Sequence, residues 1–137
     1  MNRIHAKAER IAQEFKALGY TVEPVTHSTN RNGDNSSYFW VVGLGEMRIS
    51  DHFSAHVMGW DVSTYDTAAE IVAVGEESKR RAAAEKAARD QARDALEAPF
   101  KARFLAAREH EQHDILVECY PAASKDDRRA VRRRWMA

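Results

Sequence analysis

Cysteine and long apolar runs are almost absent from this 137-residue sequence. Its one cysteine, Cys119, excludes an internal disulfide framework. The apolar runs fall well short of the roughly 18 to 20 residues that a membrane-spanning helix needs. The first residues show neither an apolar signal core nor a twin-arginine pattern, and the sequence has no phosphate-cradling glycine loop or serine elbow. We therefore expect a cytoplasmic protein that has no membrane partner and is not an enzyme.

The sequence also lacks an excess of charge of either sign. Its 21 lysines and arginines balance 21 aspartates and glutamates, so the formal net charge is zero. Residues 76–137 carry fifteen basic and twelve acidic side chains, whereas residues 1–75 carry six and nine. Dedicated nucleic-acid-binding domains usually have a pI above about 9 or a clean basic face. Overall charge therefore does not favour nucleic acid as a partner, and such binding would have to come from a local cluster.

Residues 1–75 predict an α+β domain, in which a small antiparallel sheet packs on an N-terminal helix. Apolar residues recur at helical spacing over residues 3–18, and a glycine follows at the C-cap position. Residues 21–25 include a proline and predict a short edge strand, followed by a polar loop over residues 27–37. Residues 37–50 predict a hairpin, because two β-branched and aromatic runs flank a Gly-Leu-Gly turn. One more strand is expected near residues 58–62.

Residues 76–137 predict a helical extension, made of a long charged helix and a shorter helical tail. Either Asp66 or a capping box at Thr67 and Glu70 opens the helical stretch. Alanine and opposite charges four residues apart then dominate, so the helix can persist with little burial. Pro99 is expected to interrupt or kink this helix. A second capping box, which starts at Ser124, predicts the last helix.

Small side chains form the least polar stripe of the long helix. The stripe consists of Ala84, Ala88, Ala92, Ala95 and Leu96. Such a surface suits close packing against another helix, so a second copy of the chain is one candidate partner.

The stretch RISDHFSAH, residues 48–56, places Asp51, His52 and His56 close together after the predicted hairpin. On a helix, the four-residue spacing of the histidines would align their rings for zinc or iron, with an aspartate as third ligand. At a strand end, Ser50 and Asp51 more naturally hydrogen-bond the turn that follows. We favour the second interpretation and expect no metal, cofactor or catalytic residue, while the roles of Asp51, His52 and His56 stay open.

Two weaker candidates lie near the C-terminal end of the sequence. One is a candidate metal site, made of His110, Glu111, His113 and Asp114, in which histidines three residues apart can share a metal ion. A solvated charged helix is the commoner explanation of such a pattern. The other is Cys119, a candidate catalytic nucleophile. It lies in an apolar segment without a basic neighbour in sequence, so we interpret it as a small core residue.

Basic residues cluster on the long helix and in the tail. The residues that we expect to contact protein or nucleic acid are Lys79, Arg80, Lys86, Arg89, Arg93, Arg128, Arg129, Arg132, Arg133 and Trp135. Their positive charge suits phosphate or an acidic protein surface. A solvated helix end, where cations are favoured by the helix dipole, explains the tail equally well.

The stretch GEESKRRAAAEKAARDQARDAL resembles the second helix of double-stranded RNA-binding domains, whose order of elements is α-β-β-β-α. The resemblance implies phosphate contacts at Lys79, Arg80 and Lys86. The sequence departs from that family in the long connection between Ser50 and Ser78. Because of the resemblance and the basic residues, binding of nucleic acid through the long helix and the arginine-rich C-terminal helix is kept as an alternative function.

Residues 37–52 combine Ser-Tyr, an aromatic-aliphatic strand, a glycine turn and Arg-Ile-Ser-Asp-His. This pattern is similar to a hairpin signature in small proteins of phages and plasmids, with Arg48, Ser50, Asp51 and His52 as signature positions of unknown role. The resemblance implies a mobile-element protein in a bacterial host cell, where inhibitors of host defence, including anti-CRISPR proteins, are frequent. The leading expectation is a non-enzymatic inhibitor of a host defence nuclease or nucleoprotein complex. A small metal-dependent hydrolase is a further alternative.

Overall fold

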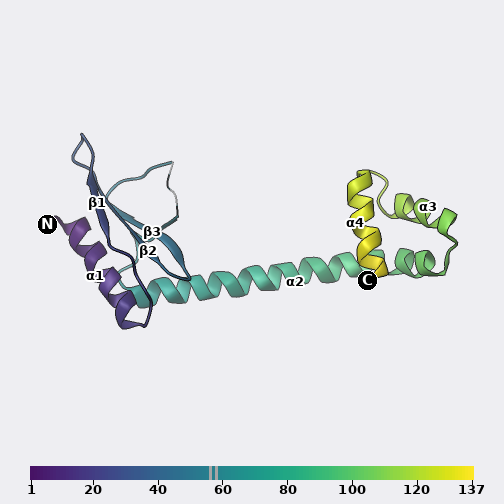
Figure 1. Cartoon of the computed structure of the whole chain (residues 1–137), viewed down its shortest axis with the longest axis horizontal. Helices are drawn as coiled ribbons and strands as arrows, with labels where there is room; N and C mark the ends of the chain where they lie inside the picture. Colours follow the sequence, from purple (N-terminus) through teal and green to yellow (C-terminus); the bar gives the residue numbers. More distant parts are fainter. Residues whose placement is uncertain (56, 58) are drawn as a thin grey trace. The chain divides into compact units, whose positions relative to one another are not determined.

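The protein has an α+β fold, and its computed structural model describes residues 1–55, 57 and 59–137. The chain divides into two compact units, Met1–Arg80 and Arg81–Ala137. Helix α2 (Ala68–Ala106) begins in the first unit and continues in the second (Figure 1). The division therefore falls inside a helix, as does the boundary predicted at residue 75.

The first unit consists of helix α1, a four-stranded sheet and the beginning of α2. Its elements before α2 are α1 (Arg3–Ala17), β1 (Thr26–Thr29), β2 (Asn35–Val41), β3 (Gly45–Ser50) and β4 (Trp60–Asp61). The strands lie in the order β1-β2-β3-β4, and α1 lies against the sheet (Figure 1). The predicted N-terminal helix and hairpin are thus confirmed.

The core of this unit forms because alternate residues of the hairpin face α1. Phe39 and Val41 of β2 and Met47 and Ile49 of β3 are almost fully buried. They pack with a stripe of α1 at helical spacing and with the first turns of α2. Arg48 lies on the opposite face of the hairpin, where it forms the centre of the candidate site.

The first strand does not lie where it was predicted. Residues 21–25 form only an isolated bridge between Val22 and Val41, and the strand lies at Thr26–Thr29, within the predicted polar loop. Pro24 has no N–H to donate and so limits regular pairing before it. All four residues of β1 are exposed, so no alternation of apolar and polar residues reveals this strand in the sequence.

The last strand is also different from the prediction, because β4 pairs with β3 in parallel. The sheet is therefore mixed rather than purely antiparallel. The predicted strand near residues 58–62 corresponds to Trp60–Asp61, whereas Met58 lies outside the described residues. Gly59 permits the approach to β3: its φ is +87°, and a Cβ there would lie 2.6 Å from the carbonyl oxygen of Glu46.

Helix α2 begins at the predicted capping box. The hydroxyl of Thr67 accepts a hydrogen bond from the Glu70 amide at 3.2 Å, and the Glu70 carboxylate accepts one from the Asp66 amide at 3.0 Å. Pro99 lies inside this helix and does not interrupt it. The predicted interruption is wrong, because the turns around Pro99 are stabilised by packing in the second unit, where Phe100 and Phe104 join the core.

The second unit contains the rest of α2 together with α3 (Glu109–Cys119) and α4 (Lys125–Met136). Ser124 caps α4, as predicted, by accepting a hydrogen bond from the Asp127 amide at 3.1 Å. The three helices meet at a small apolar core. Its buried members are Phe104, Ile115, Leu116, Val131 and Trp135.

One carboxylate, that of Glu97 on α2, is buried beside this core, with only 2% of the residue exposed. It accepts hydrogen bonds from Arg134, from the Tyr120 hydroxyl and, at 2.8 Å, from the Trp135 indole. Burial opposes the charge of Glu97, but these hydrogen bonds outweigh it and lower the pKa of its carboxyl. Glu97 therefore ties α2 to the chain around α4.

Candidate functional site

The hairpin signature is organised around Arg48, whose side chain is only 1% exposed although it carries a charge. Its Nη1 donates to the Asp61 carboxylate at 2.8 Å, and its Nε donates to the Tyr38 hydroxyl at 3.3 Å. Its Nη2 lies 3.4 Å from the carbonyl oxygen of His52. Arg48 thereby joins β2, β3, β4 and the segment after β3.

Asp61 stays ionised opposite this arginine. Burial raises the pKa of Asp61, but hydrogen bonds from Ser63 and the charge and hydrogen bond of Arg48 lower it by more. Buried charges are rare unless they are paired with an opposite charge, and Asp61 is the partner that pairs with the buried charge of Arg48.

The remaining signature residues hold the end of β3. The Ser50 hydroxyl donates to the His52 carbonyl oxygen at 2.8 Å, and the Ser50 amide donates to the hydroxyl of Ser63 at 2.9 Å. The Asp51 carboxylate accepts from the backbone amide and the side-chain amide of Asn35, at 2.9 and 3.2 Å. The predicted hydrogen bond of Ser50 to the residues that follow is confirmed, whereas Asp51 bonds mainly to Asn35 at the start of β2 and reaches the following residues only through the His52 side chain.

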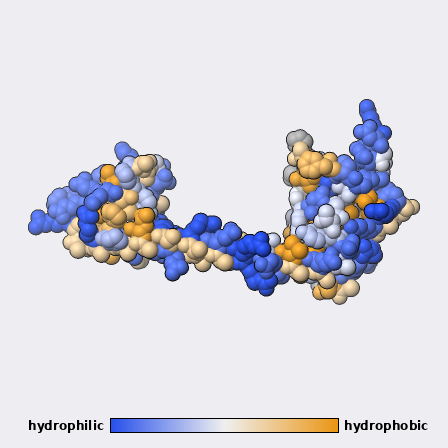
Figure 2. All heavy atoms as spheres, turned by 180° about the vertical axis from the view of Figure 1, so that it is seen from behind, coloured by the Kyte–Doolittle hydropathy of each residue, from blue (hydrophilic) through white to orange (hydrophobic). Residues whose placement is uncertain are grey.

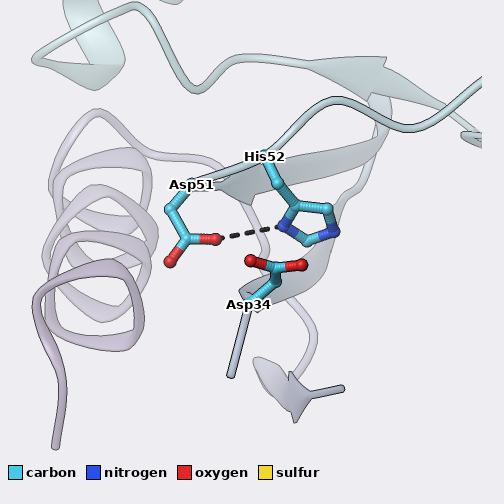
Figure 3. Close-up of side chains that lie close together, drawn as sticks. All are labelled: Asp34, Asp51 and His52. Carbon is cyan, nitrogen blue, oxygen red and sulfur yellow. Dashed lines mark hydrogen bonds and ion pairs between the residues drawn. The ribbon is translucent and has the colours of Figure 1, made fainter. Parts of the chain in front are cut away.

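Asp51 and His52 also form a small cluster with Asp34, shown in Figure 3. Asp34 lies just before β2 and the other two residues just after β3, so the paired hairpin strands bring them together. One ligand-type atom from each residue lies within 4.8 Å of the others. The predicted partner His56 lies outside the described residues, whereas Asp34 was not predicted.

The hydrogen bonds of this cluster limit what it can do chemically. The Nδ1 of His52 lies 3.0 Å from an Asp51 carboxylate oxygen, and the Nη2 of Arg48 lies 3.4 Å from the His52 Nε2. In a neutral imidazole that donates through Nδ1, Nε2 is the acceptor. The Asn35 amide, followed by His52, lowers the pKa of Asp51 and keeps this carboxyl ionised. A cation at this site would have to compete with these existing partners.

The basic residues predicted on α2 are exposed or half-buried, and several are paired along the helix. Arg80 pairs with Glu77 at 2.7 Å, Lys86 pairs with Asp90 at 2.8 Å, and Arg93 pairs with Asp94 at 3.0 Å. Lys79 and Arg89 are exposed. The α2 helix starts at Ala68 with an acid, Glu70, in its first turn, so Lys79, Arg80 and Lys86 lie well inside it. These residues therefore do not lie at the start of the helix, as the resemblance to double-stranded RNA-binding domains implied, and their contacts with phosphate stay a prediction.

The least polar stripe of α2, Ala84 to Leu96, is exposed in the described structure. Figure 2 shows hydrophilic side chains along one side of the middle of this helix and moderately hydrophobic ones along the other.

The basic residues of α4 divide into an exposed set and an inward-facing one. Arg129, Arg132 and Arg133 are exposed, and Arg128 is half-buried. Trp135 was predicted to be a binding residue, but it is 3% exposed and belongs to the core. The prediction is wrong for Trp135 because Val131 and Trp135 lie four residues apart on the face of α4 that packs on α2 and α3.

A cleft of about 360 Å³ lies between α3 and α4 within the second unit. It is lined from α3 by Glu109, Gln112, His113 and Leu116, and from α4 by Lys125, Arg128, Arg129 and Arg132. Arg133 does not line it. The three arginines were predicted from the sequence, whereas Lys125 and the α3 residues were not, and His113 was considered as a metal ligand rather than as part of a cleft. The positions 125, 128, 129 and 132 do share a helical spacing, which marks one face of α4.

Among the residues that the structure describes, no helix is both long enough and apolar enough to cross a membrane. Comparison of the chain with models of protein families, with curated proteins and with solved structures found no match.

Proposed function

We propose that this chain is a non-enzymatic binding protein, which docks the cationic face of its second unit on a nucleoprotein complex and thereby inhibits that complex. In the mobile-element context that the hairpin signature implies, the complex is a defence nuclease of a bacterial host. An inhibitor of this kind needs a shaped, charged surface rather than catalytic groups.

The observation that carries the proposal is the cation stripe of α4, which consists of Lys125, Arg128, Arg129 and Arg132. Within the described residues, Lys125 and Arg132 have no acidic partner, and Arg129 has only Asp126 at 3.7 Å, with both side chains largely exposed. Such a contact contributes little to stability. The stripe is therefore available to an anionic partner, and complementary charge mainly increases the rate and selectivity of association.

The arrangement of the hairpin signature gives indirect support. Arg48, Ser50 and Asp51 hold strands and turns together, so the part of the sequence that most resembled a catalytic site already has a structural role. A binding surface elsewhere on the chain is consistent with that role.

Affinity capture from a host lysate tests the proposal. The wild-type chain is compared with an Arg129→Glu, Arg132→Glu variant, and each eluate is analysed by mass spectrometry. The expected result is recovery of a nuclease or nucleoprotein complex by the wild-type chain alone, together with a lower cleavage rate when the purified chain is added. Equal recovery by both proteins, or an unchanged cleavage rate, would contradict the proposal.

A metal-dependent hydrolase is the second candidate, because Asp34, Asp51 and His52 bring three ligand-type atoms within 4.8 Å of one another. Calorimetric titration with Mn²⁺ and Zn²⁺ tests it. Stoichiometric binding that is lost in an Asp34→Asn variant would favour this candidate. Absence of binding, or equal binding by the variant, would remove its basis.

A further inference from the structure

The cleft between α3 and α4 has a chemical character that the proposed function does not specify. It combines the cation stripe on one wall with an apolar and hydrogen-bonding wall from α3. We infer that this cleft binds one nucleotide of a single-stranded nucleic acid, with its phosphate on α4 and its base against α3. The inference rests on the proposed function to the extent that both use α4, but it can be tested on the purified chain alone.

The α4 wall presents four cations from one face of the helix. Their spacing of three, four and seven residues from Lys125 places them in a single row. Among the described residues, Glu109 is the only acidic side chain that lines the cleft. Like charges that converge on a concave surface repel one another and concentrate the positive potential there, so an anion stabilises the arrangement.

Arg128 is held in position by the chain that precedes α4. Its Nε donates to the carbonyl oxygen of Tyr120 at 3.2 Å, and its Nη2 donates to that of Pro121 at 2.9 Å. A guanidinium has five N–H donors, so donors remain for a ligand after these two bonds. Forked donors of this kind match phosphate oxygens in geometry as well as in charge.

The α3 wall offers different contacts. Leu116 is 4% exposed and supplies apolar surface, while His113 supplies an exposed ring. Gln112 donates its side-chain N–H to the carbonyl oxygen of Phe104 at 3.2 Å, which leaves its own oxygen as an acceptor. A flat base with polar edges fits such a wall.

The combination favours a single strand over other anions. A single-stranded nucleic acid carries a negative charge and an accessible planar base on each residue, and proteins bind it with basic grooves and stacking side chains. A duplex keeps its bases stacked inside and would leave the α3 wall without a partner. An acidic peptide would satisfy the cations but supplies no base. The volume of about 360 Å³ suits a group of nucleotide size.

Fluorescence anisotropy with a labelled single-stranded oligonucleotide tests the inference on the full chain, over a series of salt concentrations. The test variant is Arg132→Ala, and the matched control is Arg133→Ala, which removes the same charge from the next residue, outside the cleft. Both side chains are exposed, so both variants should keep the wild-type melting temperature.

We expect Arg132→Ala to weaken binding about tenfold, the loss typical of one charge-assisted hydrogen bond. The slope of log affinity against log salt should fall by about 0.7, because one phosphate contact is lost from a single strand. Arg133→Ala should change affinity less than about twofold, since its charge lies outside the cleft.

Four outcomes would overturn the inference. They are no binding of any oligonucleotide at low salt, equal losses in the two variants, equal binding of a duplex of the same sequence, and tighter binding of polyglutamate that depends on Arg132. The first outcome leaves the inhibition proposal intact if the captured complex is still recovered. Conversely, oligonucleotide binding without capture or inhibition would support the cleft and remove the inhibitory role.

Discussion

Replacing Glu97 by glutamine removes the charge from the most deeply buried acidic group of the described chain while keeping its shape. In the folded protein this carboxylate accepts hydrogen bonds from Arg134, Tyr120 and Trp135. Glutamine can still accept from the indole or the hydroxyl, but it offers a weaker partner to the guanidinium. The substitution thus isolates the contribution of the charge.

The size of the effect follows from the burial of the two charged partners. Removing one member of a buried ion pair costs about 3 to 5 kcal/mol, since the other charge is left unpaired. The Arg134 side chain is 35% exposed, so water compensates part of its charge, and glutamine keeps one acceptor. We therefore expect Glu97→Gln to lower the free energy of unfolding of the second unit by about 2 kcal/mol, or its melting temperature by about 10 °C.

The pH dependence gives an independent check with a definite sign. Because folding lowers the pKa of Glu97 below its ordinary value of 4.5, its ionised form stabilises the fold above that pH. The stabilisation is lost as the pH falls through the lowered pKa. The difference in stability between wild type and Glu97→Gln should accordingly be full at pH 7 and shrink in acid below pH 4.5.

The assay is thermal unfolding followed by Trp135 fluorescence, in a background where the other two tryptophans, Trp40 and Trp60, are replaced by phenylalanine. Asp94→Asn is the matched control, because Asp94 is exposed and its pairing with Arg93 should add nothing measurable. A Glu97→Gln protein with the same melting temperature as the wild type at pH 7 would refute the reasoning. So would a difference that stays constant in acid.

Tyr120 reports on the same network by a different measurement. Burial, followed by the hydrogen bond to the Glu97 carboxylate, raises the pKa of the Tyr120 phenol to about 12. In the Glu97→Gln variant the phenol loses its ionised neighbour. An absorbance titration should then show this tyrosine ionising at a lower pH than in the wild type, whereas an unchanged titration would place Glu97 away from the phenol.

Four further outcomes are expected. Arg48→Met should lower the free energy of unfolding of the first unit by about 2 kcal/mol, measured by urea denaturation, because the Tyr38 hydroxyl and one oxygen of the Asp61 carboxylate lose their guanidinium partner. Asp51→Ala should speed hydrogen exchange of the Asn35 amide, which loses its acceptor, and an unchanged exchange rate would argue against this anchor. Gly59→Ala should cost several kcal/mol in the same denaturation assay, since its Cβ would clash with backbone at a positive φ. If the alanine stripe joins two copies of the chain, sedimentation should show a dimer that Ala88→Glu abolishes; a monomer at all concentrations would contradict that prediction.

Several elements could be predicted because the residues that determine them are close together in the sequence. The apolar spacing of α1, the two runs of the β2–β3 hairpin, and the capping residues Thr67 and Ser124 each act over a few neighbouring positions. The hydrogen bond of Ser50 to the His52 carbonyl oxygen was likewise predictable from its place at a strand end, whereas the bonds of Asp51 to Asn35 depend on the pairing of β2 with β3.

Other features could not be predicted because their partners are distant in sequence. Strand β1 is polar and exposed, and it is held by backbone pairing with β2 rather than by an apolar face. Strand β4 is only two residues long, and its parallel pairing depends on the approach of Gly59 to β3. Asp34 joins Asp51 and His52 only once the hairpin has closed.

The sequence by itself determined the α+β class, the helical second half, and a cluster of arginines near its end, because periodicity, capping and charge are properties of short segments. The tertiary structure decided how those arginines are used. Packing of α4 on α2 and α3 turns Arg134 and Trp135 inward to Glu97, and it leaves Arg128, Arg129 and Arg132 on a cleft that α3 completes. A side chain's place in the core or at a surface depends on which elements meet, and those elements are far apart along the chain.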